Sequence, residues 1–377
     1  MNFSYDRVLG QLPDPLRMHD GSRMTDSAQW PQKRAELLAD VVPLLYGGMP
    51  PEPEVFELLP LFVDSEVKTY LITAGTRQKT VRFELKLRLP RDAQGPCPVV
   101  LDGDGCFRYL NDEVVRDANQ RGFAVGSFNR TVLAMDVFRD ARSHARHGGL
   151  YEVYPEARFG ALAAWAWGYH RAVDALMQLP ELIDPQAIAV TGHSRGGKTT
   201  LLAAATDPRI TFCNTNCSGA AGAGCFRYEQ HEAPDSPLHD HACETLADLV
   251  RVIPFWLGPD APAYVGREAE LPFDQHFLKA AVAPRWLLET DCINDIWGNP
   301  RGSYQTYRAA RAVYRALGVE DHIACVFRDR VHYHEVRDYQ IFFDFIEDVR
   351  AGRPFLQDNA DRVMAGLPLA FDLGKPE

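Results

Sequence analysis

Residues 188–205 read IAVTGHSRGGKTTLLAAA, and this stretch fits two incompatible functional motifs. Gly192-His193-Ser194-Arg195-Gly196 fits G-x-S-x-G, in which a sharp turn between a strand and a helix raises a serine hydroxyl above a sheet. Gly192 through Thr199 also fits G-x-x-x-x-G-K-[ST], a loop whose backbone N–H groups bind phosphates. The sequence supplies the strand before and the helix after that either motif needs. The rest of the chain must therefore decide whether Ser194 is a nucleophile or Lys198 binds a phosphate.

The composition is that of an ordinary globular α/β protein and excludes several classes. The chain has 377 residues, of which 46% are hydrophobic, and a net charge of −11 without any Lys/Arg-rich run, which argues against a nucleic-acid partner. No apolar run is long enough to span a membrane, and the N-terminus has no signal-peptide pattern. The eight cysteines are scattered without a C-x-x-C pair. We therefore expect reduced thiols and a cytoplasmic location.

The strand and helix signals alternate along most of the chain. Val81, Phe83, Leu85 and Leu87 alternate with charged residues, which predicts a half-exposed antiparallel strand over 80–89. Short apolar runs and helix-like stretches then follow one another. We expect strands at 98–101, 122–127, 188–190, 210–213, 285–290 and 323–327, and helices at 32–45, 160–179 and 338–349. This order predicts a mostly parallel sheet covered by helices on both faces, which is a three-layer sandwich.

We expect one domain over 1–377 rather than two. Residues 1–50 form an N-terminal extension with a helix, and 351–377 form a C-terminal tail. Residues 218–270 are irregular and rich in Gly, Ala, Pro and His, so we interpret them as an insertion that lines the cleft.

The hydrolase interpretation finds its remaining catalytic groups in the required chain order. Such enzymes place the acid after a late strand and the histidine near the end. Asp291 and Asp295 follow the strand that ends at Thr290, and His332 follows the next strand. Serine needs an imidazole to take its proton, and the imidazole needs a carboxylate to fix its tautomer. Chain order alone leaves both Asp295 and Asp291 open as this acid.

An oxyanion hole is expected from the backbone N–H after the serine, at Arg195, and from the loop 102–105. The phosphate-loop alternative also stays possible, because Asp291 at the end of a hydrophobic strand could hold magnesium. At least three predicted strands precede the serine, however, whereas a phosphate loop often follows the first strand of its domain. The hydrolase interpretation is therefore favoured.

Other polar residues have simpler interpretations. His193 is expected to pack inside the turn and His276 to form a hydrogen bond within the domain, while His334 is the alternative general base to His332. The residues His239, Asp240, His241, Cys243 and Glu244 are of types that bind zinc, but their spacing matches no zinc motif. We therefore expect no metal and no cofactor.

Several segments together resemble the glucuronoyl esterase family, carbohydrate esterase family 15, and its bacterial branch in particular. They occur in the order of the family over about residues 30–350. The segments are G160-ALAAWAWG with Asp174, V190-TGHSRGGK, L271-PFDQH leading to A283-PR, D295-IWGNP, and Arg328 to His332 with Asp338 beyond. The resemblance implies an α/β-hydrolase fold and cleavage of the ester between glucuronic acid on xylan and a lignin alcohol.

The resemblance also implies roles for individual residues. Ser194 matches the nucleophile, Arg195 an arginine that stabilises the oxyanion, and His332 the general base. Lys198 and Trp297 match residues that contact sugar hydroxyls, and Glu244 stands where a polar sugar-binding residue is expected. This chain departs from the family pattern at three positions, since Cys217 replaces a common catalytic Glu, Asn299 replaces a second acid, and Val252 stands near where a sugar-contacting Glu is usual. With Cys217 in that place, Asp295 is the acid that the resemblance implies.

We therefore predict a metal-independent serine carboxylesterase that forms an acyl-enzyme on an ester of a uronic acid of the 4-O-methyl-glucuronate type. The alternatives are a cytoplasmic esterase or deacetylase acting on another small ester, a P-loop-like nucleotide-binding protein, and a catalytically silent binding protein on the same fold. A small-molecule or carbohydrate ester is the expected partner, without nucleic acid or membrane. The sequence leaves the oligomeric state and the leaving alcohol open.

Overall fold

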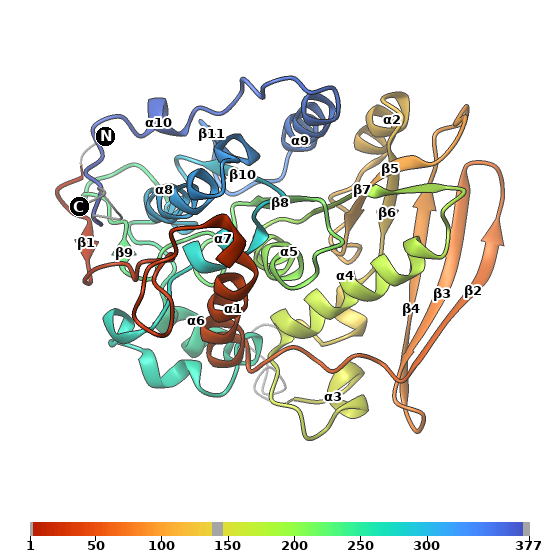
Figure 1. Cartoon of the computed structure of the whole chain (residues 1–377), viewed down its shortest axis with the longest axis horizontal. Coiled ribbons are helices and arrows are strands. Elements are labelled where there is room, and N and C mark those ends of the chain that lie inside the picture. The colour runs from red at the N-terminus through yellow and green to blue at the C-terminus, as the bar shows by residue number, and fades with distance from the viewer. Residues whose placement is uncertain (1–2, 138–145, 372–377) are drawn as a thin grey trace.

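The computed structural model describes residues 3–137 and 146–371, and a nine-stranded sheet runs through its centre (Figure 1). The order of strands across this sheet is β11-β10-β8-β7-β5-β6-β4-β3-β2, and β1 and β9 form a separate two-stranded sheet. The strands are β1 (Arg7–Val8), β2 (Val55–Val63), β3 (Val67–Gly75), β4 (Thr80–Arg88), β5 (Cys97–Asp102), β6 (Ala124–Ser127), β7 (Ile183–Thr191), β8 (Phe212–Asn216), β9 (Tyr228–Glu229), β10 (Trp286–Cys292) and β11 (Ile323–Arg328).

The sheet has a parallel part and an antiparallel part. The strands β6, β5, β7, β8, β10 and β11 pair in parallel, whereas β2, β3, β4 and β6 pair antiparallel to one another. In β4 the apolar side chains are buried and the charged ones face outward, as the alternation predicts. Parallel strands present their carboxyl ends at one edge of a sheet, and ligands of open α/β sheets bind there.

Helices cover both faces of the sheet, which confirms the predicted α/β-hydrolase architecture. Helices α2 and α9 pack on one face, and α1, α4, α5, α7 and α8 lie on the other (Figure 1). The helices are α1 (Trp30–Tyr46), α2 (Asp112–Gln120), α3 (Gly149–Val153), α4 (Ala161–Met177), α5 (Arg195–Thr206), α6 (Leu246–Val252), α7 (His276–Val282), α8 (Pro300–Ala316), α9 (Val336–Arg350) and α10 (Ala360–Val363). Helix α4 is buried on nearly all sides, which explains its continuous apolar sequence.

The sequence analysis did not predict β2, β3, α2 or α8. Strand β2 contains Pro60, which lacks a backbone N–H and so argues against a strand. The structure accommodates this proline because β2 is the edge strand and its register shifts between Pro60 and Phe62. Helix α8 begins after Asn299, whose side chain caps the N–H of Gly302 at 3.0 Å.

The segment 218–270 contains β9, α6 and three short 3₁₀ helices, over Pro254–Trp256, Ala261–Tyr264 and Glu268–Glu270, joined by irregular stretches. Its residues Ser218, Glu244, Asp248 and Trp256 line a pocket at the carboxyl end of the parallel strands. None of the helices in the described ranges is long and apolar enough to cross a membrane.

Candidate active site

Ser194 lies in a strained turn between β7 and α5. Its backbone has φ 54° and ψ −118°, a conformation that non-glycine residues adopt rarely and at a free-energy cost of about 1–3 kcal/mol. The glycines on either side of Ser194 are required because other atoms of the protein lie too close to them to leave room for a side chain. A Cβ on Gly192 would lie 2.6 Å from the carbonyl of Gly196, and a Cβ on Gly196 would lie 1.9 Å from Asp104 Oδ2. These glycines allow the tight turn that presents the serine hydroxyl.

The same turn cannot bind a phosphate as a P-loop does. The backbone N–H of Ser194 donates to Asn216 O at 2.8 Å, and that of Gly196 donates to His193 O at 2.7 Å. Lys198 Nζ is buried and donates to Glu244 Oε2 at 2.6 Å. Two N–H groups and the ammonium are thus already engaged, so the phosphate-loop alternative is wrong.

His332 and Asp295 come together in the structure as the sequence predicts. His332 Nδ1 lies 2.7 Å from Asp295 Oδ2, and Asp295 is almost fully buried. Burial acts to lower the pKa of His332, but the hydrogen bond and the charge of Asp295 outweigh it, so the pKa is raised above 6.5. This contact leaves Nε2 of His332 as the nitrogen that can accept a proton.

Asp291 lies apart from this pair. Its Oδ1 accepts the backbone N–H of Cys292 at 2.9 Å. Burial first, and then the charge of Asp295, raise its pKa to about 7. The hydrogen bonding therefore favours Asp295 over Asp291 as the partner of His332.

His193 and His276 take the structural places expected of them, and His334, the alternative general base, is buried. His193 Nδ1 lies 2.6 Å from Asn216 Oδ1, and burial lowers its pKa to about 3. His276 Nε2 lies 2.9 Å from Pro13 O inside the domain. His334 is buried and stacks on Tyr339 at 4.1 Å between ring centroids, and burial holds its pKa well below 6.5. This placement makes His334 a poorer general base than His332.

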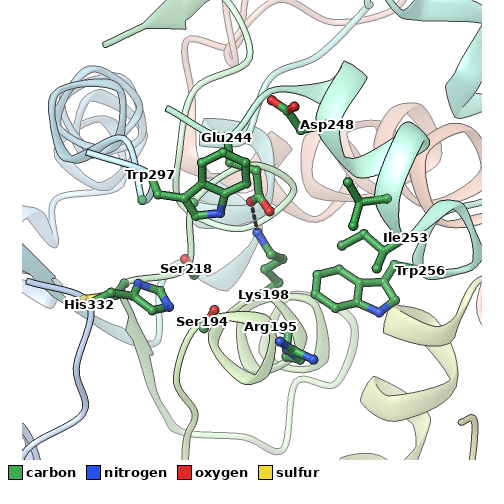
Figure 2. A pocket seen from close by; sticks show the side chains of 14 residues that line it. Ser194, Arg195, Lys198, Ser218, Glu244, Asp248, Ile253, Trp256, Trp297 and His332 are labelled. Atoms are coloured by element: carbon green, nitrogen blue, oxygen red, sulfur yellow. Dashed lines mark hydrogen bonds and ion pairs between the residues drawn. The ribbon is translucent and has the colours of Figure 1, made fainter. Parts of the chain in front are cut away.

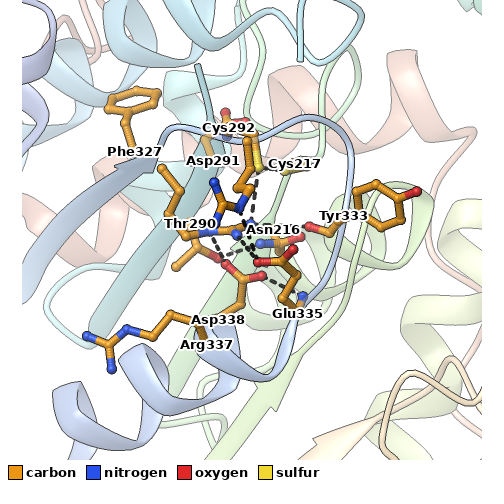
Figure 3. Close-up of polar contacts among 12 residues, drawn as sticks. Asn216, Cys217, Thr290, Asp291, Cys292, Phe327, Tyr333, Glu335, Arg337 and Asp338 are labelled. Atoms are coloured by element: carbon orange, nitrogen blue, oxygen red, sulfur yellow. Dashed lines mark hydrogen bonds and ion pairs between the residues drawn. The ribbon is translucent and has the colours of Figure 1, made fainter. Parts of the chain in front are cut away.

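Arg328 fixes the loop that carries His332. Its guanidinium lies at the end of β11 and forms ion pairs with Asp338 at 2.5 Å and Glu335 at 3.2 Å, both at the start of α9. It also donates to Tyr333 O at 3.2 Å and to Cys292 Sγ at 3.1 Å. Figure 3 labels these partners, Cys292, Tyr333, Glu335 and Asp338. The chain on both sides of His332 is therefore tied to the ends of β10 and β11.

A pocket of about 250 Å³ joins Ser194 and His332 to the predicted binding residues. Figure 2 shows Ser194 and His332 near one wall, Lys198 and Glu244 across from them, and Trp297 at the rim. Each of the seven site residues predicted from the sequence contributes to this arrangement. Six of them line the pocket, and Asp295 contacts it through His332.

Lys198 and Glu244 form a buried ion pair in this pocket. Lys198 Nζ also donates to Ala220 O at 2.5 Å, and Glu244 is held through its backbone N–H, which donates to Trp297 O at 2.9 Å. Burial lowers the pKa of Lys198, and Glu244 opposes that effect. Removing one partner of such a pair leaves the other buried and uncompensated.

Arg195 is held over the pocket by a chain of charges. Its Nη1 lies 3.0 Å from Asp136 Oδ2, and the same carboxylate oxygen lies 3.2 Å from Arg130 Nη1. Arg130 in turn contacts Asp104 at 2.7 Å. Trp256 Nε1 donates to the second oxygen of Asp136 at 3.2 Å. Asp136 therefore fixes both the guanidinium and an aromatic wall of the pocket.

The loop 102–105 does not have the role expected of it. The N–H groups of Gly103, Asp104 and Gly105 donate to Tyr169 Oη, Asp102 Oδ1 and Phe128 O. These donors are engaged within the fold, and the carboxylate of Asp104 would repel an oxyanion. The expectation of an oxyanion donor in this loop is therefore wrong, because the loop instead supports the turn at Ser194 from beneath.

Sequence reasoning missed four polar or aromatic residues of the site: Asp136, Ser218, Asp248 and Trp256. Asp248 lies one helical turn before Val252 in α6, and both line the pocket, so this chain has a carboxylate close to the position at which it lacks the Glu that the resemblance implies. The sequence of α6 did not indicate that Asp248 would line the pocket. The one sequence feature that pointed to Asp248 was its position four residues after Glu244.

The candidate zinc residues at 239–244 do not come together in the described part of the chain. His239 is nearly fully exposed and Cys243 is buried, so the two side chains face different environments. The one group of three metal-binding residue types found close together among the described residues is Cys217, Asp295 and His332.

On an α/β-hydrolase sheet, a serine at a strained strand–helix turn and a histidine bound to a buried carboxylate are the groups that acyl transfer requires. The protein is a carboxylic ester hydrolase of the serine type.

A family profile described as "Glucuronyl esterase, fungi" matches residues 72–318. The 4-O-methyl-glucuronoyl methylesterase 1 of Wolfiporia cocos is 32% identical over 83% of this chain and 73% of its own length. A solved carbohydrate esterase family 15 glucuronoyl esterase from Caldicellulosiruptor kristjansonii is 30% identical, covers 98% of both chains and superposes with a TM-score of 0.83. The catalytic domain of the Hypocrea jecorina enzyme is 26% identical, with a TM-score of 0.74 over 94% of this chain and 92% of that domain. The chain belongs to the glucuronoyl esterase family, carbohydrate esterase family 15.

Proposed function

We propose that the protein hydrolyses esters of a uronic acid of the 4-O-methyl-glucuronate type. The observation that carries this proposal is the buried Lys198–Glu244 ion pair, which shares one pocket with Ser194 and His332. A pocket for simple esters has no need of two buried charges, whereas a sugar ring presents several hydroxyls that can bind both. The 4-O-methyl-glucuronoyl methylesterase of Wolfiporia cocos, named for such an ester, supports this choice.

In the proposed mechanism, Ser194 Oγ attacks the ester carbonyl carbon while His332 Nε2 takes the hydroxyl proton. Asp295 holds Nδ1 of His332 and stabilises the imidazolium that forms. The developing oxyanion is stabilised by Arg195, whose guanidinium Asp136 holds in place. The imidazolium then protonates the leaving alcohol, and water, activated by His332, releases the uronic acid from Ser194.

The substrate residues have separate roles in this proposal. Lys198 and Glu244 bind hydroxyls of the sugar, and Trp297, 38% exposed, covers the ring at the rim of the pocket. Asp248 supplies a further carboxylate on the wall formed by α6. The cytoplasmic location stays a prediction. The reduced state of the cysteines also stays a prediction, and titration of the thiols in protein isolated from cells would test it.

The experiment that tests this function combines active-site labelling with a pair of substrates. A fluorophosphonate probe should add to Ser194, and Ser194→Ala should abolish labelling and lower ester turnover by roughly 10³-fold or more. Methyl or benzyl glucuronate should be cleaved with a much higher kcat/KM than p-nitrophenyl acetate. Equal cleavage of both substrate classes, with labelling intact, would leave a general esterase and overturn the uronate proposal.

A further inference from the structure

Cys217 lies beside the Asp295–His332 pair, and no step of the proposed mechanism uses it. The side chains of Cys217, Asp295 and His332 each offer one donor atom, and the three atoms lie within 4.8 Å of one another. Cys217 follows β8, Asp295 follows β10 and His332 follows β11, and these three strands are neighbours in the sheet. The parallel topology therefore brings a thiol, a carboxylate and an imidazole to one point at the carboxyl edge.

These donor types are those that zinc and cadmium prefer. Zinc binds thiolate sulfur at about 2.3 Å and imidazole nitrogen or carboxylate oxygen at about 2.0–2.2 Å, so neighbouring donors of a tetrahedral site lie roughly 3.3–3.7 Å apart. The three donor atoms lie within 4.8 Å of one another, and Asp295 Oδ2 and His332 Nδ1 are 2.7 Å apart, so the largest of these separations exceeds such spacing by only about 1 Å. Cys217 and Asp295 are buried, but His332 is 38% exposed at its side chain and lines the pocket, which gives a cation a path to the site.

The nearby cations do not exclude a metal ion, because each is paired with carboxylates. Lys198 is neutralised by Glu244 at 2.6 Å. Arg328 is neutralised by Asp338 at 2.5 Å and by Glu335 at 3.2 Å. The charge of Asp295 is then available to a cation that replaces its contact with the imidazole.

We propose that Cys217, Asp295 and His332 form a binding site for a thiophilic divalent cation such as Zn²⁺, and that occupancy of this site inhibits the esterase. The metal bonds to Cys217 Sγ, Asp295 Oδ2 and His332 Nδ1, with water completing four ligands. The thiol proton of Cys217 is released to solvent, and the proton of His332 moves from Nδ1 to Nε2. One proton leaves per metal bound, and nothing is oxidised or reduced.

Inhibition follows from the position of the remaining imidazole proton. With Nδ1 bound to metal, Nε2 carries the proton and cannot accept the one on Ser194 Oγ. Asp295 also no longer orients the ring. This consequence rests on the proposed roles of His332 and Asp295, whereas metal binding itself does not.

Binding is tested on the Ser194→Ala protein, in which substrate turnover does not interfere. Co²⁺ should produce a thiolate-to-cobalt charge-transfer band, and Zn²⁺ should displace it with one ion bound per chain in equilibrium dialysis. Adding Cys217→Ser should remove the band and weaken zinc binding by at least about 10-fold, the lower end of the loss typical for perturbed metal sites. The matched control is Cys106→Ser, because Cys106 is an exposed thiol and should leave both signals unchanged. A band that survives Cys217→Ser, or is lost in Cys106→Ser, would place the metal elsewhere and overturn the proposal.

Inhibition is tested on the active protein by comparing each variant with its own metal-free rate. Zinc should inhibit ester cleavage, and a chelator should restore it. The inhibition constant should rise at least about 10-fold in Cys217→Ala and in Cys217→Ser. Fluorophosphonate labelling of Ser194 shows that each variant is folded. If zinc binds at Cys217 without slowing cleavage, the inhibitory part of the proposal is wrong. If Ser194→Ala still cleaves esters, the proposed function fails while the metal site stands.

Discussion

Two cavities meet at Ser194 and His332, and they differ in chemistry. The inner pocket of about 250 Å³ contains the buried ion pair of Lys198 and Glu244, and the half-buried Asp248, which pairs with Arg251 at 2.8 Å. The outer hollow of about 350 Å³ is lined by Phe107, Tyr109 and Tyr333 with neighbouring histidines. Phe107 is 44% exposed and Tyr333 is 61% exposed. The inner pocket is therefore fixed before a ligand arrives, and the outer hollow is open and aromatic.

This difference teaches where specificity can arise. A pocket of paired buried charges rejects a ligand that leaves those charges without hydrogen bonds. Exposed aromatic rings contribute contact area but reject little. We therefore expect the acid part of the ester to be selected strictly in the inner pocket and the alcohol part to be tolerated broadly in the outer hollow.

The largest effect on both cavities alike should come from Asp295, the partner of the His332 side chain that lines both of them. Asp295→Asn should lower kcat by roughly 10²–10⁴-fold, because an amide stabilises the wrong tautomer of His332. Asp291→Asn is the matched control, since Asp291 instead accepts the backbone N–H of Cys292. Steady-state kinetics on methyl glucuronate measures both variants. The reverse ranking would identify Asp291 as the catalytic acid.

The pH dependence should report the same histidine on every substrate. His332 acts as a base only when neutral, and its pKa is raised by Asp295, so the acid limb of kcat/KM should lie above pH 6.5. Below that limb the rate should fall about 10-fold per pH unit. The residual activity of Asp295→Asn should show the limb at lower pH. A wild-type limb below 6.5 would contradict the assignment of His332 as the base.

The inner pocket alone should respond to loss of its ammonium group. Lys198→Met should lower kcat/KM for methyl glucuronate by about 5–150-fold, equivalent to about 1–3 kcal/mol, because Glu244 is left buried without its partner. Cleavage of p-nitrophenyl acetate should change little, since Lys198 takes no part in proton transfer. Glu244→Gln tests the other member of the pair. Equal losses on both substrates would show that the ion pair supports the fold rather than the sugar.

Asp136 should affect the rate of chemistry more than binding. Asp136→Asn weakens the contact that holds Arg195, so kcat should fall on the order of 10-fold, less than the ~10²–10³-fold typical when an oxyanion donor is lost. KM should stay nearly constant for both glucuronate and acetate esters. Asp136→Glu should recover part of the rate, because it retains the charge. A rise in KM with kcat unchanged would instead place Asp136 in substrate binding.

The smallest effect should come from the outer hollow. Tyr333→Ala should lower kcat/KM for benzyl glucuronate by about 2–5-fold, as expected for loss of one exposed aromatic contact. Methyl glucuronate has no ring to contact and should be unaffected. Competition between the two esters in one reaction measures the ratio directly. An equal loss on both esters would mean that Tyr333 acts by positioning its neighbour His332.

The sequence predicted what is encoded locally. The turn at Ser194, the alternation of β4 and the apolar helix α4 depend on neighbours within a few residues, and the structure confirms them. The chain order of acid and histidine also followed from strand counting. Choosing Asp295 over Asp291 required the resemblance, because the sequence pattern placed both after the same strand, whereas in the structure Asp291 lies within β10 and only Asp295 follows it.

Contacts between distant segments could not be predicted in this way. Asp136 and Trp256 are separated by 120 residues and meet only because the segment 218–270 folds back over the pocket. Strand β2 was missed because Pro60 is compatible with a strand only at a sheet edge, and edge position is a property of the whole sheet. The engaged N–H groups of the loop 102–105 likewise depend on Tyr169 and Phe128, which lie on other elements.

The positive φ of Ser194 has a consequence for the stability of the molecule as a whole. A residue without a Cβ would adopt this conformation without strain. The backbone strain at Ser194 therefore lowers the free energy of unfolding by about 1–3 kcal/mol. This is a considerable share of the roughly 5–15 kcal/mol by which a typical native protein is stable. Most of the sequence stabilises the fold, but at residue 194 thermal stability and ester cleavage favour different amino acids.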